Sequence, residues 1–297
     1  MRPDPNATDP RLRVDSYRAI GRASTDEVVR PQFSDIDSWG LTHQGKVRKQ
    51  NQDHFFLGAL ARGVTVDRTS IDAEGRRVLH AERLASLGMV ADGVGSTEGG
   101  GEAARIAVRD LVSSVSKFFH EAEHVESEDP EVFSRLLHDA ALDCHESLLA
   151  KAAEEADERH FATTLTLFLG LWPHAYLLQI GDSRCYVFRD GELTQISRDQ
   201  TLAQELVDSG AMTRTTAVRS RWAGVLSSAM GGDTAAPVVT RMERDWGTVI
   251  LLCSDGLTKH VPDERISERL AAMTSARQVS EQLLQDALDG GGTDNIT

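Results

Sequence analysis

The sequence predicts an α+β fold built mainly from antiparallel sheets. Several short apolar stretches are joined by turn signals, such as Asp190-Gly191, that are typical of β-hairpins. Two amphipathic segments follow one another without an intervening strand, so the chain lacks the regular strand–helix alternation of a parallel sheet. Apolar residues make up 40% of the 297 residues, which is enough for a sizeable core.

Six apolar or alternating stretches are expected to form strands. In chain order they are residues 88–91, 164–169, 175–180, 184–189, 192–196 and 248–253. Trp172-Pro173 separates the second stretch from the third, and Asp190-Gly191 separates the fourth from the fifth, so each pair predicts a hairpin. Residues 64–83 alternate weakly and indicate another hairpin.

Two segments carry apolar side chains at helical spacing. The first has them at Ala104, Val108, Leu111, Val115 and Phe118, and the second at Phe133, Leu137, Ala140, Cys144 and Leu148. Each spacing predicts an amphipathic helix that covers a sheet. A third helix is expected over residues 276–288.

The first 34 residues are polar and show no periodicity. We interpret residues 1–34 as an extension or flexible tail, with a short helix over residues 17–23 as the alternative. The compact domain is expected to span residues 35–297.

Composition narrows the class of protein. The formal net charge of −14 argues against a surface for nucleic acid or anionic membranes, because such surfaces gain affinity from concentrated Lys and Arg. No apolar stretch approaches the ~20 residues of a membrane span, and residues 1–5 show no signal-peptide pattern. We therefore expect a cytoplasmic protein that binds neither nucleic acid nor membrane.

Three apolar stretches are followed by an Asp beside a small residue. The pairs are Asp92-Gly93, Asp182-Ser183 and Asp255-Gly256, while Asp53 and Asp294 lie in polar segments. A strand end packed in the core is a rigid mount, and a following glycine lets the backbone approach a ligand closely. Several such mounts can direct carboxylates at one point, where they repel each other unless a cation lies between them. For Asp182 we favour a structural role at its strand end.

The residue types indicate which cation such a cluster would hold. Carboxylate oxygens suit Mg²⁺ or Mn²⁺, whereas imidazole and thiolate suit zinc, copper or iron. The chain has ten His but no HExxH motif. Its three cysteines, Cys144, Cys185 and Cys253, are far apart, so neither a thiolate zinc site nor a disulfide scaffold is expected.

Six short motifs occur in one order along the chain. They are Gly45-Lys46-Val47-Arg48-x-x-Asn51-Gln52-Asp53, Val90-Ala91-Asp92-Gly93-Val94-Gly95, Ala162-Thr163-Thr164, Ile180-Gly181-Asp182-Ser183-Arg184, Leu252-Cys253-Ser254-Asp255-Gly256-Leu257 and Gly292-Thr293-Asp294-Asn295-Ile296. Each motif is weak alone, but the set in this order and spacing is specific. From about Trp39 to Thr297 the sequence resembles the metal-dependent protein phosphatase family, the protein phosphatase 2C type, in its bacterial form.

The resemblance implies a four-layer α-β-β-α sandwich with two mostly antiparallel central sheets and a two-metal centre at one end. Asp92 is expected to bridge both metal ions, and Gly93 to offer its backbone carbonyl to one of them. Asp255 and Asp294 would hold the other ion. Asp53 would complete the site directly or through water. The cofactor is expected to be Mn²⁺ or Mg²⁺, bound as two ions or, if a further site exists, as three.

Arg48 and Asp92 are the residues that the resemblance assigns to catalysis. Two divalent ions at ~3.5–4 Å can lower the pKa of a shared water, which then attacks phosphorus in line. Arg48 is expected to grip the substrate phosphate, because a guanidinium can hold two phosphate oxygens at once.

Two departures from the family concern the metals. Gln52 stands where many relatives carry Glu, and it removes one negative charge, which puts the affinity for the second ion in doubt. Bacterial relatives often bind a third ion through an Asp just before the third motif. Asp157 or Glu158 could serve here, but a solvated face of a helix over residues 152–158 is the favoured interpretation.

The flap region and the end of the sequence carry two further expectations. Residues 204–229 correspond to the family's flap, and their Arg214, Arg219 and Arg221 indicate either phosphopeptide contact or ordinary solvated charges. The sequence stops at Thr297, where relatives continue into a closing strand, so the domain is a trimmed fragment or lacks that strand. A neighbouring strand would then be left as an exposed edge.

The resemblance implies a phosphoprotein phosphatase that hydrolyses phosphoserine and phosphothreonine and opposes Ser/Thr kinases in a bacterial cell. We expect a monomer whose partners are phosphorylated proteins. One alternative is a degenerate relative that binds phosphoproteins without turnover, which only Gln52 supports. Another is a different two-metal hydrolase such as a nuclease, which the missing basic stripe disfavours.

Overall fold

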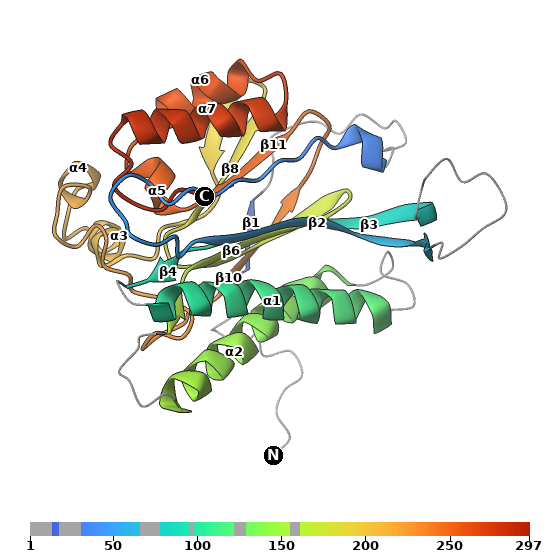
Figure 1. Ribbon diagram of the computed structural model, residues 1–297, viewed down its shortest axis with the longest axis horizontal. Helices are drawn as coiled ribbons and strands as arrows, with labels where there is room; N and C mark the ends of the chain where they lie inside the picture. The colour runs from blue at the N-terminus through green and yellow to red at the C-terminus, as the bar shows by residue number, and fades with distance from the viewer. Residues whose placement is uncertain (1–13, 18–30, 66–77, 96–97, 122–128, 155–160) are drawn as a thin grey trace.

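Four layers of secondary structure make up the described chain, with helices outside two central sheets (Figure 1). The structure is a computed structural model that describes residues 14–17, 31–65, 78–95, 98–121, 129–154 and 161–297. The α-β-β-α sandwich implied by the family resemblance is confirmed.

The larger sheet has six strands in the order β1-β10-β7-β6-β3-β2. Their bounds are β1 Val14–Tyr17, β2 His54–Thr65, β3 Val78–Ala91, β6 Leu165–Leu171, β7 His174–Ile180 and β10 Val238–Glu243. All neighbours are antiparallel except β1 and β10, which run parallel. The β2–β3 pairing runs from His54↔Ala91 to Thr65↔Val78. Of the hairpin expected over residues 64–83, the ends therefore pair as expected, and residues 66–77 lie outside the described part.

The smaller sheet is antiparallel and has the order β11-β8-β9. Its strands are β8 Arg184–Arg189, β9 Glu192–Gln195 and β11 Val249–Cys253. Within the described residues, β11 lies at an edge of this sheet. A separate pair of two-residue strands, β4 Gly93–Val94 and β5 Ala162–Thr163, lies beside the sandwich.

Two long helices, α1 Glu98–Glu121 and α2 Pro130–Glu154, cover the outer face of the larger sheet (Figure 1). The outer face of the smaller sheet is covered by α6 Asp263–Ala271 and α7 Ala276–Asp289. Short helices α3 Leu202–Asp208, α4 Arg214–Ala217 and α5 Asp255–Thr258 gather at one end, and a 3-10 turn spans Phe33–Asp35. No helix among the described residues is long and apolar enough to cross a membrane.

Three apolar clusters fill the spaces between the four layers. Helices α1 and α2 pack on the larger sheet through fully buried side chains such as Leu111, Leu137 and Tyr176. Phe168 and Cys185 belong to the cluster between the two sheets. The third cluster, which joins the smaller sheet to α6 and α7, contains Tyr186, Ile266, Leu270 and Leu283. These clusters fix the strand ends on which the site is built.

The expected strands and helices over residues 88–288 are confirmed, but β3 begins ten residues earlier than expected and α1 and α2 each begin or end up to six residues beyond their expected bounds. Most of β2, all of β10 and the short helices α3–α6 are elements that no pattern in the sequence predicted. Of the expected N-terminal extension, residues 14–17 form β1, and residues 1–13 and 18–30 lie outside the described part. The alternative helix over residues 17–23 therefore falls almost entirely outside it.

Candidate metal centre

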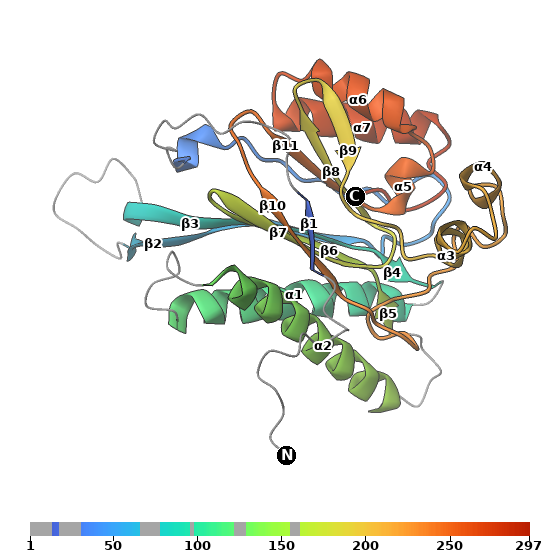
Figure 2. The same ribbon diagram turned by 180° about the vertical axis from the view of Figure 1, so that it is seen from behind.

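Four chain segments meet at the end of the sandwich that carries α5 and β4 (Figures 1 and 2). They are the loop before β2, the end of β3, the junction of β11 and α5, and residues 292–297. These segments hold all the residues expected to form the site. The expected site residues can therefore lie close together at this end of the sandwich.

Asp92 directly follows β3, and its backbone is held on both sides. Its N–H donates to Thr164 Oγ1 at 3.0 Å, and its carbonyl accepts from the Thr164 N–H at 2.9 Å. The Thr163 hydroxyl donates to the same carbonyl at 2.9 Å. Thr164 Oγ1 also lies 2.7 Å from Ser183 Oγ, which connects the end of β3 to the end of β7. The motif Ala162-Thr163-Thr164 thus positions Asp92.

Asn295 fastens the loop before β2 to the last described segment. Its amide Nδ2 donates to the carbonyls of Gln44 and Gln50, each at 2.9 Å, and its Oδ1 accepts from the Gln52 N–H at 2.9 Å. The amide satisfies three backbone groups at once, and its side chain is buried. Asp294 is therefore held beside the loop that carries Arg48.

Asp53 and Asp255 each present a carboxylate oxygen that is buried and unsatisfied. Asp53 Oδ2 accepts from the Thr297 hydroxyl at 2.7 Å. Among the described residues, Asp53 Oδ1 and Asp255 Oδ1 accept no hydrogen bond. A buried oxygen without a partner costs free energy, so both atoms are suited to a cation ligand.

Burial and neighbouring negative charges raise the pKa of three aspartates at this site. Burial raises the pKa of Asp92 well above its usual range, and the charges of Asp53, Asp255, Asp182 and Asp294 add to the effect. Burial likewise raises the pKa of Asp53 to about 6, and that of Asp182 to about 7 with a further contribution from Asp255. We call Asp53, Asp92, Asp182, Asp255 and Asp294 the acidic cluster.

Among the residues that the structure describes, Arg48 and Lys259 contact the acidic cluster directly. The Arg48 guanidinium is bidentate on Asp294, with Nε–Oδ1 at 2.7 Å and Nη2–Oδ2 at 2.8 Å. Lys259 Nζ lies 2.6 Å from Asp255 Oδ2 and 2.7 Å from Asp294 Oδ2. Burial alone would raise the pKa of Asp294, but the hydrogen bonds from Arg48 and Lys259 outweigh it and lower that pKa.

The donor chemistry of the cluster fits hard divalent cations. All the side-chain donors are carboxylate oxygens, two of them are unsatisfied, and their mutual repulsion would be relieved by positive charge. In the described chain, however, no three His, Cys, Asp or Glu side chains converge on one metal position. Asp255 and Asp294 are turned toward Lys259, and Asp294 also toward Arg48. Metal binding thus requires side-chain rearrangement at these two residues.

The structure brings Arg48, Asp53, Asp92, Asp255 and Asp294 together, as expected. It also places Asp182 in the acidic cluster, a position that the structural role favoured for it did not anticipate. The same strand-then-Asp signal marks it, but the sequence does not show which strand ends meet. Lys259, four residues after Asp255, was missed as well.

The other expected residues fall as follows. Gly93 pairs with Thr163, and a Cβ atom at Gly93 would lie 2.4 Å from the backbone of Gly100, so a side chain there would separate β4 from α1. Gln52 is buried beside Asp53. Asp157 and Glu158, considered for a third metal, lie outside the described residues.

The flap segment lies beside the site. Helices α3 and α4 lie near α5 and β4 in both views (Figures 1 and 2). Arg214, Arg219 and Arg221 are exposed, and the Arg221 guanidinium stacks 4.4 Å from the ring centroid of Trp222. These arginines stay free to meet solvent or a bound peptide.

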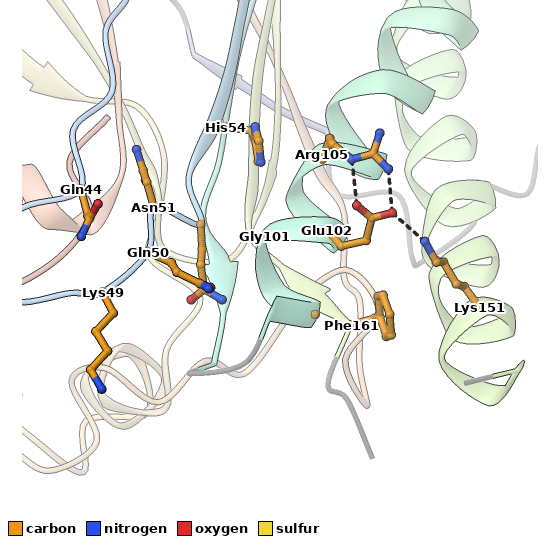
Figure 3. Close-up of a pocket in the computed structure, with 12 residues that line it drawn as sticks. Gln44, Lys49, Gln50, Asn51, His54, Gly101, Glu102, Arg105, Lys151 and Phe161 are labelled. Atoms are coloured by element: carbon orange, nitrogen blue, oxygen red, sulfur yellow. Dashed lines mark hydrogen bonds and ion pairs between the residues drawn. The ribbon is translucent and has the colours of Figure 1, made fainter. Parts of the chain in front are cut away.

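A pocket of about 710 Å³ lies between the loop before β2 and the first turns of α1 (Figure 3). The loop and the first turns of α1 form two of its walls, and Lys151 and Phe161 form the far side. Glu102 in this pocket pairs with Arg105 at 2.6 Å and with Lys151 at 2.7 Å. With Lys49 the lining carries three cations against one carboxylate.

Comparison with known proteins decides the family. Residues 72–289 match the family described as protein phosphatase 2C. The chain belongs to the protein phosphatase 2C family. It is 36% identical over 257 residues to the serine/threonine protein phosphatase PstP of Mycobacterium tuberculosis, a match that covers 86% of this chain and 42% of that protein. The chain thus spans less than half the length of that relative.

Further relatives agree in sequence and fold. The serine/threonine phosphatase stp of Listeria welshimeri is 29% identical over 210 residues, which cover 70% of this chain and 81% of that protein. The crystal structure of M. tuberculosis PstP/Ppp superposes with a TM-score of 0.68 at 30% identity, covering 86% of this chain and 93% of that one. The PstP catalytic domain in complex with two manganese ions gives a TM-score of 0.65 at 30% identity, with the same coverage.

Proposed function

We propose that this protein is a metal-dependent phosphatase that hydrolyses phosphoserine and phosphothreonine in proteins. The observation that carries the proposal is the acidic cluster at the end of the sandwich, where four chain segments bring together the carboxylates expected to bind metal. Membership of the protein phosphatase 2C family and similarity to PstP support the same activity. The PstP catalytic domain with two manganese ions supports Mn²⁺ or Mg²⁺ as cofactor.

Each residue has a role that follows from its position. Asp92, whose backbone is fixed by Thr163 and Thr164, would help to hold both ions, and Gly93 could offer its backbone carbonyl as a further ligand. Asp53, Asp255 and Asp294 would supply the remaining protein ligands. When bound, the two ions would lower the pKa of a water and neutralise charge on the phosphoryl oxygens.

Arg48 would orient the substrate at the edge of the cluster. Its side chain is 44% exposed, so the guanidinium can meet a phosphate that arrives from solvent. The bidentate contact with Asp294 supports this role, because the same guanidinium fork can hold two phosphate oxygens. We propose that Arg48 exchanges this carboxylate for the substrate phosphate.

The decisive experiment measures phosphate release from a phosphothreonine peptide with Mn²⁺, with Mg²⁺ and with EDTA. We expect Mn²⁺-dependent turnover, and Asp92→Asn should reduce kcat by at least about 10²-fold, because it removes the charge shared by both ions. Asp245→Asn is a matched control, since Asp245 pairs with Arg189 at the far end of β8 and its loss should change kcat by no more than a few fold.

The alternatives give different results in the same assay. Hydrolysis of a phosphodiester but not of the phosphopeptide would indicate a nuclease-like hydrolase. Tight binding of the phosphopeptide with bound Mn²⁺ but no phosphate release would indicate a degenerate binding protein. Either outcome would contradict the proposed function.

The relatives also indicate a cellular setting. The named relatives are bacterial serine/threonine phosphatases, so we propose that this chain acts in a bacterial cytoplasm and opposes a Ser/Thr kinase. We also propose that it acts as a monomer, because one chain supplies all four segments of the site.

A further inference from the structure

Lys259 is the feature of the site that the proposed function leaves unexplained. It lies just after α5, and its ammonium is within 2.7 Å of carboxylate oxygens of both Asp255 and Asp294. A pair with Asp255 alone would be an ordinary contact across one helical turn. The second contact, to a residue 35 positions later, places the ammonium between two expected metal ligands.

The position of Lys259 matters because the carboxylates around it carry a large negative charge. With every group ionised, the five carboxylates of the acidic cluster face two cations, Arg48 and Lys259. Arg48 lies at the exposed edge and pairs with Asp294, whereas Lys259 pairs with both Asp255 and Asp294. Removal of Lys259 would leave Asp255 and Asp294 with less compensating charge and a stronger mutual repulsion.

We propose that Lys259 is a built-in counter-ion that competes with one of the two divalent ions for Asp255 and Asp294. This inference rests on the proposed two-metal centre. A divalent ion that takes these oxygens must either displace the ammonium or bind beside it. In both cases the positive charge of Lys259 opposes the metal, so it stabilises the metal-free protein and weakens metal binding.

The orientation of the carboxylates supports this assignment. Asp255 Oδ2 faces Lys259 while Asp255 Oδ1 stays buried and unsatisfied within the described structure. Both oxygens of Asp294 are occupied by Arg48 and Lys259. Asp255 and Asp294 are therefore oriented toward a positive charge, and in this structure Lys259 supplies that charge.

The test is Mn²⁺ affinity, measured by calorimetry and by the electron paramagnetic resonance signal of free Mn²⁺. Lys259→Met keeps the aliphatic stem and removes the charge, and it should tighten the weaker Mn²⁺ binding step by on the order of tenfold. Lys259→Arg keeps the charge and should stay close to wild type. Lys151→Met removes a lysine that pairs with Glu102 outside the cluster, so it is the matched control and should not change Mn²⁺ affinity.

Thermal unfolding gives an independent readout. In EDTA, Lys259→Met should melt at a lower temperature than Lys259→Arg, and saturating Mn²⁺ should raise its Tm by more than it raises that of wild type. Unchanged or weaker Mn²⁺ binding by Lys259→Met, with normal binding by wild type, would overturn the role of Lys259 and leave the proposed function intact. Absence of Mn²⁺ binding by wild type and variant alike would overturn both.

Discussion

At the scale of single residues, the site depends on glycines that let its segments touch. A Cβ atom on Gly256 would lie 1.8 Å from the backbone oxygen of Asn295. One on Gly45, whose φ is +80°, would lie 2.1 Å from the backbone oxygen of Asp294. A rotation of side chains cannot relieve contacts with backbone atoms. Gly256 therefore lets α5 and Asp255 approach residues 294–296, and Gly45 lets the loop that carries Arg48 approach Asp294.

Gly256→Ala tests this close approach. The added methyl group must push α5 away from residues 294–297, so we expect a loss of about 2 kcal/mol in the free energy of unfolding and weaker Mn²⁺ binding. Urea denaturation and calorimetry measure the two effects. Gly224→Ala is the control, since a Cβ atom there meets nothing within 4 Å. Equal effects of the two substitutions would contradict the packing argument.

The sequence predicted most residues of the acidic cluster, but it did not predict the places of Asp182 and Lys259. Asp92 and Asp255 follow apolar strands, and the motif order assigned Asp53 and Asp294. Asp182 carries the same signal, but its place in the cluster depends on the pairing of β3, β6 and β7, which no local pattern fixes. Lys259 resembles a surface lysine until the contact between residues 255 and 294 is known.

At the scale of elements, Asp286 on α7 forms salt bridges to two arginines on α6. Asp286 on α7 accepts from Arg269 Nε at 2.7 Å and from Arg265 Nε at 3.0 Å, both on α6. The hydrogen bond from Arg269, together with that from Arg265, lowers the pKa of Asp286 to about 2. The carboxylate therefore stabilises the packing of the two helices that cover the smaller sheet.

The loss of folding stability caused by Asp286→Asn should depend on pH. The folded pKa is below the ordinary value, so the contribution is fully present above about pH 4 and is lost as the pH falls toward 2. We expect a cost of about 1 kcal/mol at pH 7, since the pair lies near solvent, and a shrinking difference from wild type below about pH 4. Urea denaturation from pH 7 to pH 3 measures the difference in the free energy of unfolding between Asp286→Asn and wild type. Asp289→Asn is the control. A difference that does not change with pH would contradict the assignment.

The elements were predictable where their patterns are long. The helical spacing of α1 and α2 and the hairpin turns beside β7 and β8 gave correct elements. Strand β10 was missed because it is short and carries charged residues, and its identity comes from pairing with β7. The short helices α3–α5 depend on caps and on tertiary contacts, such as the Thr201 hydroxyl that caps α3, rather than on periodicity.

At the scale of the whole molecule, a chain with a formal charge of −14 concentrates part of its acidity in one site. The four-layer order followed from the family resemblance, whereas composition and periodicity indicated only an α+β fold with antiparallel sheets. The net charge disfavoured nucleic acid, but it did not indicate a phosphate ligand. That inference required the placement of Asp at strand ends, together with cations that act locally.

The central claim is that the acidic cluster holds two divalent ions. Anomalous diffraction at the manganese edge, from crystals grown with Mn²⁺, tests it most directly. We predict two peaks bounded by Asp53, Asp92, Asp255 and Asp294, with the Asp294 carboxylate turned away from Lys259. Absence of peaks among these carboxylates, in a protein that diffracts with ordered side chains there, would contradict the account.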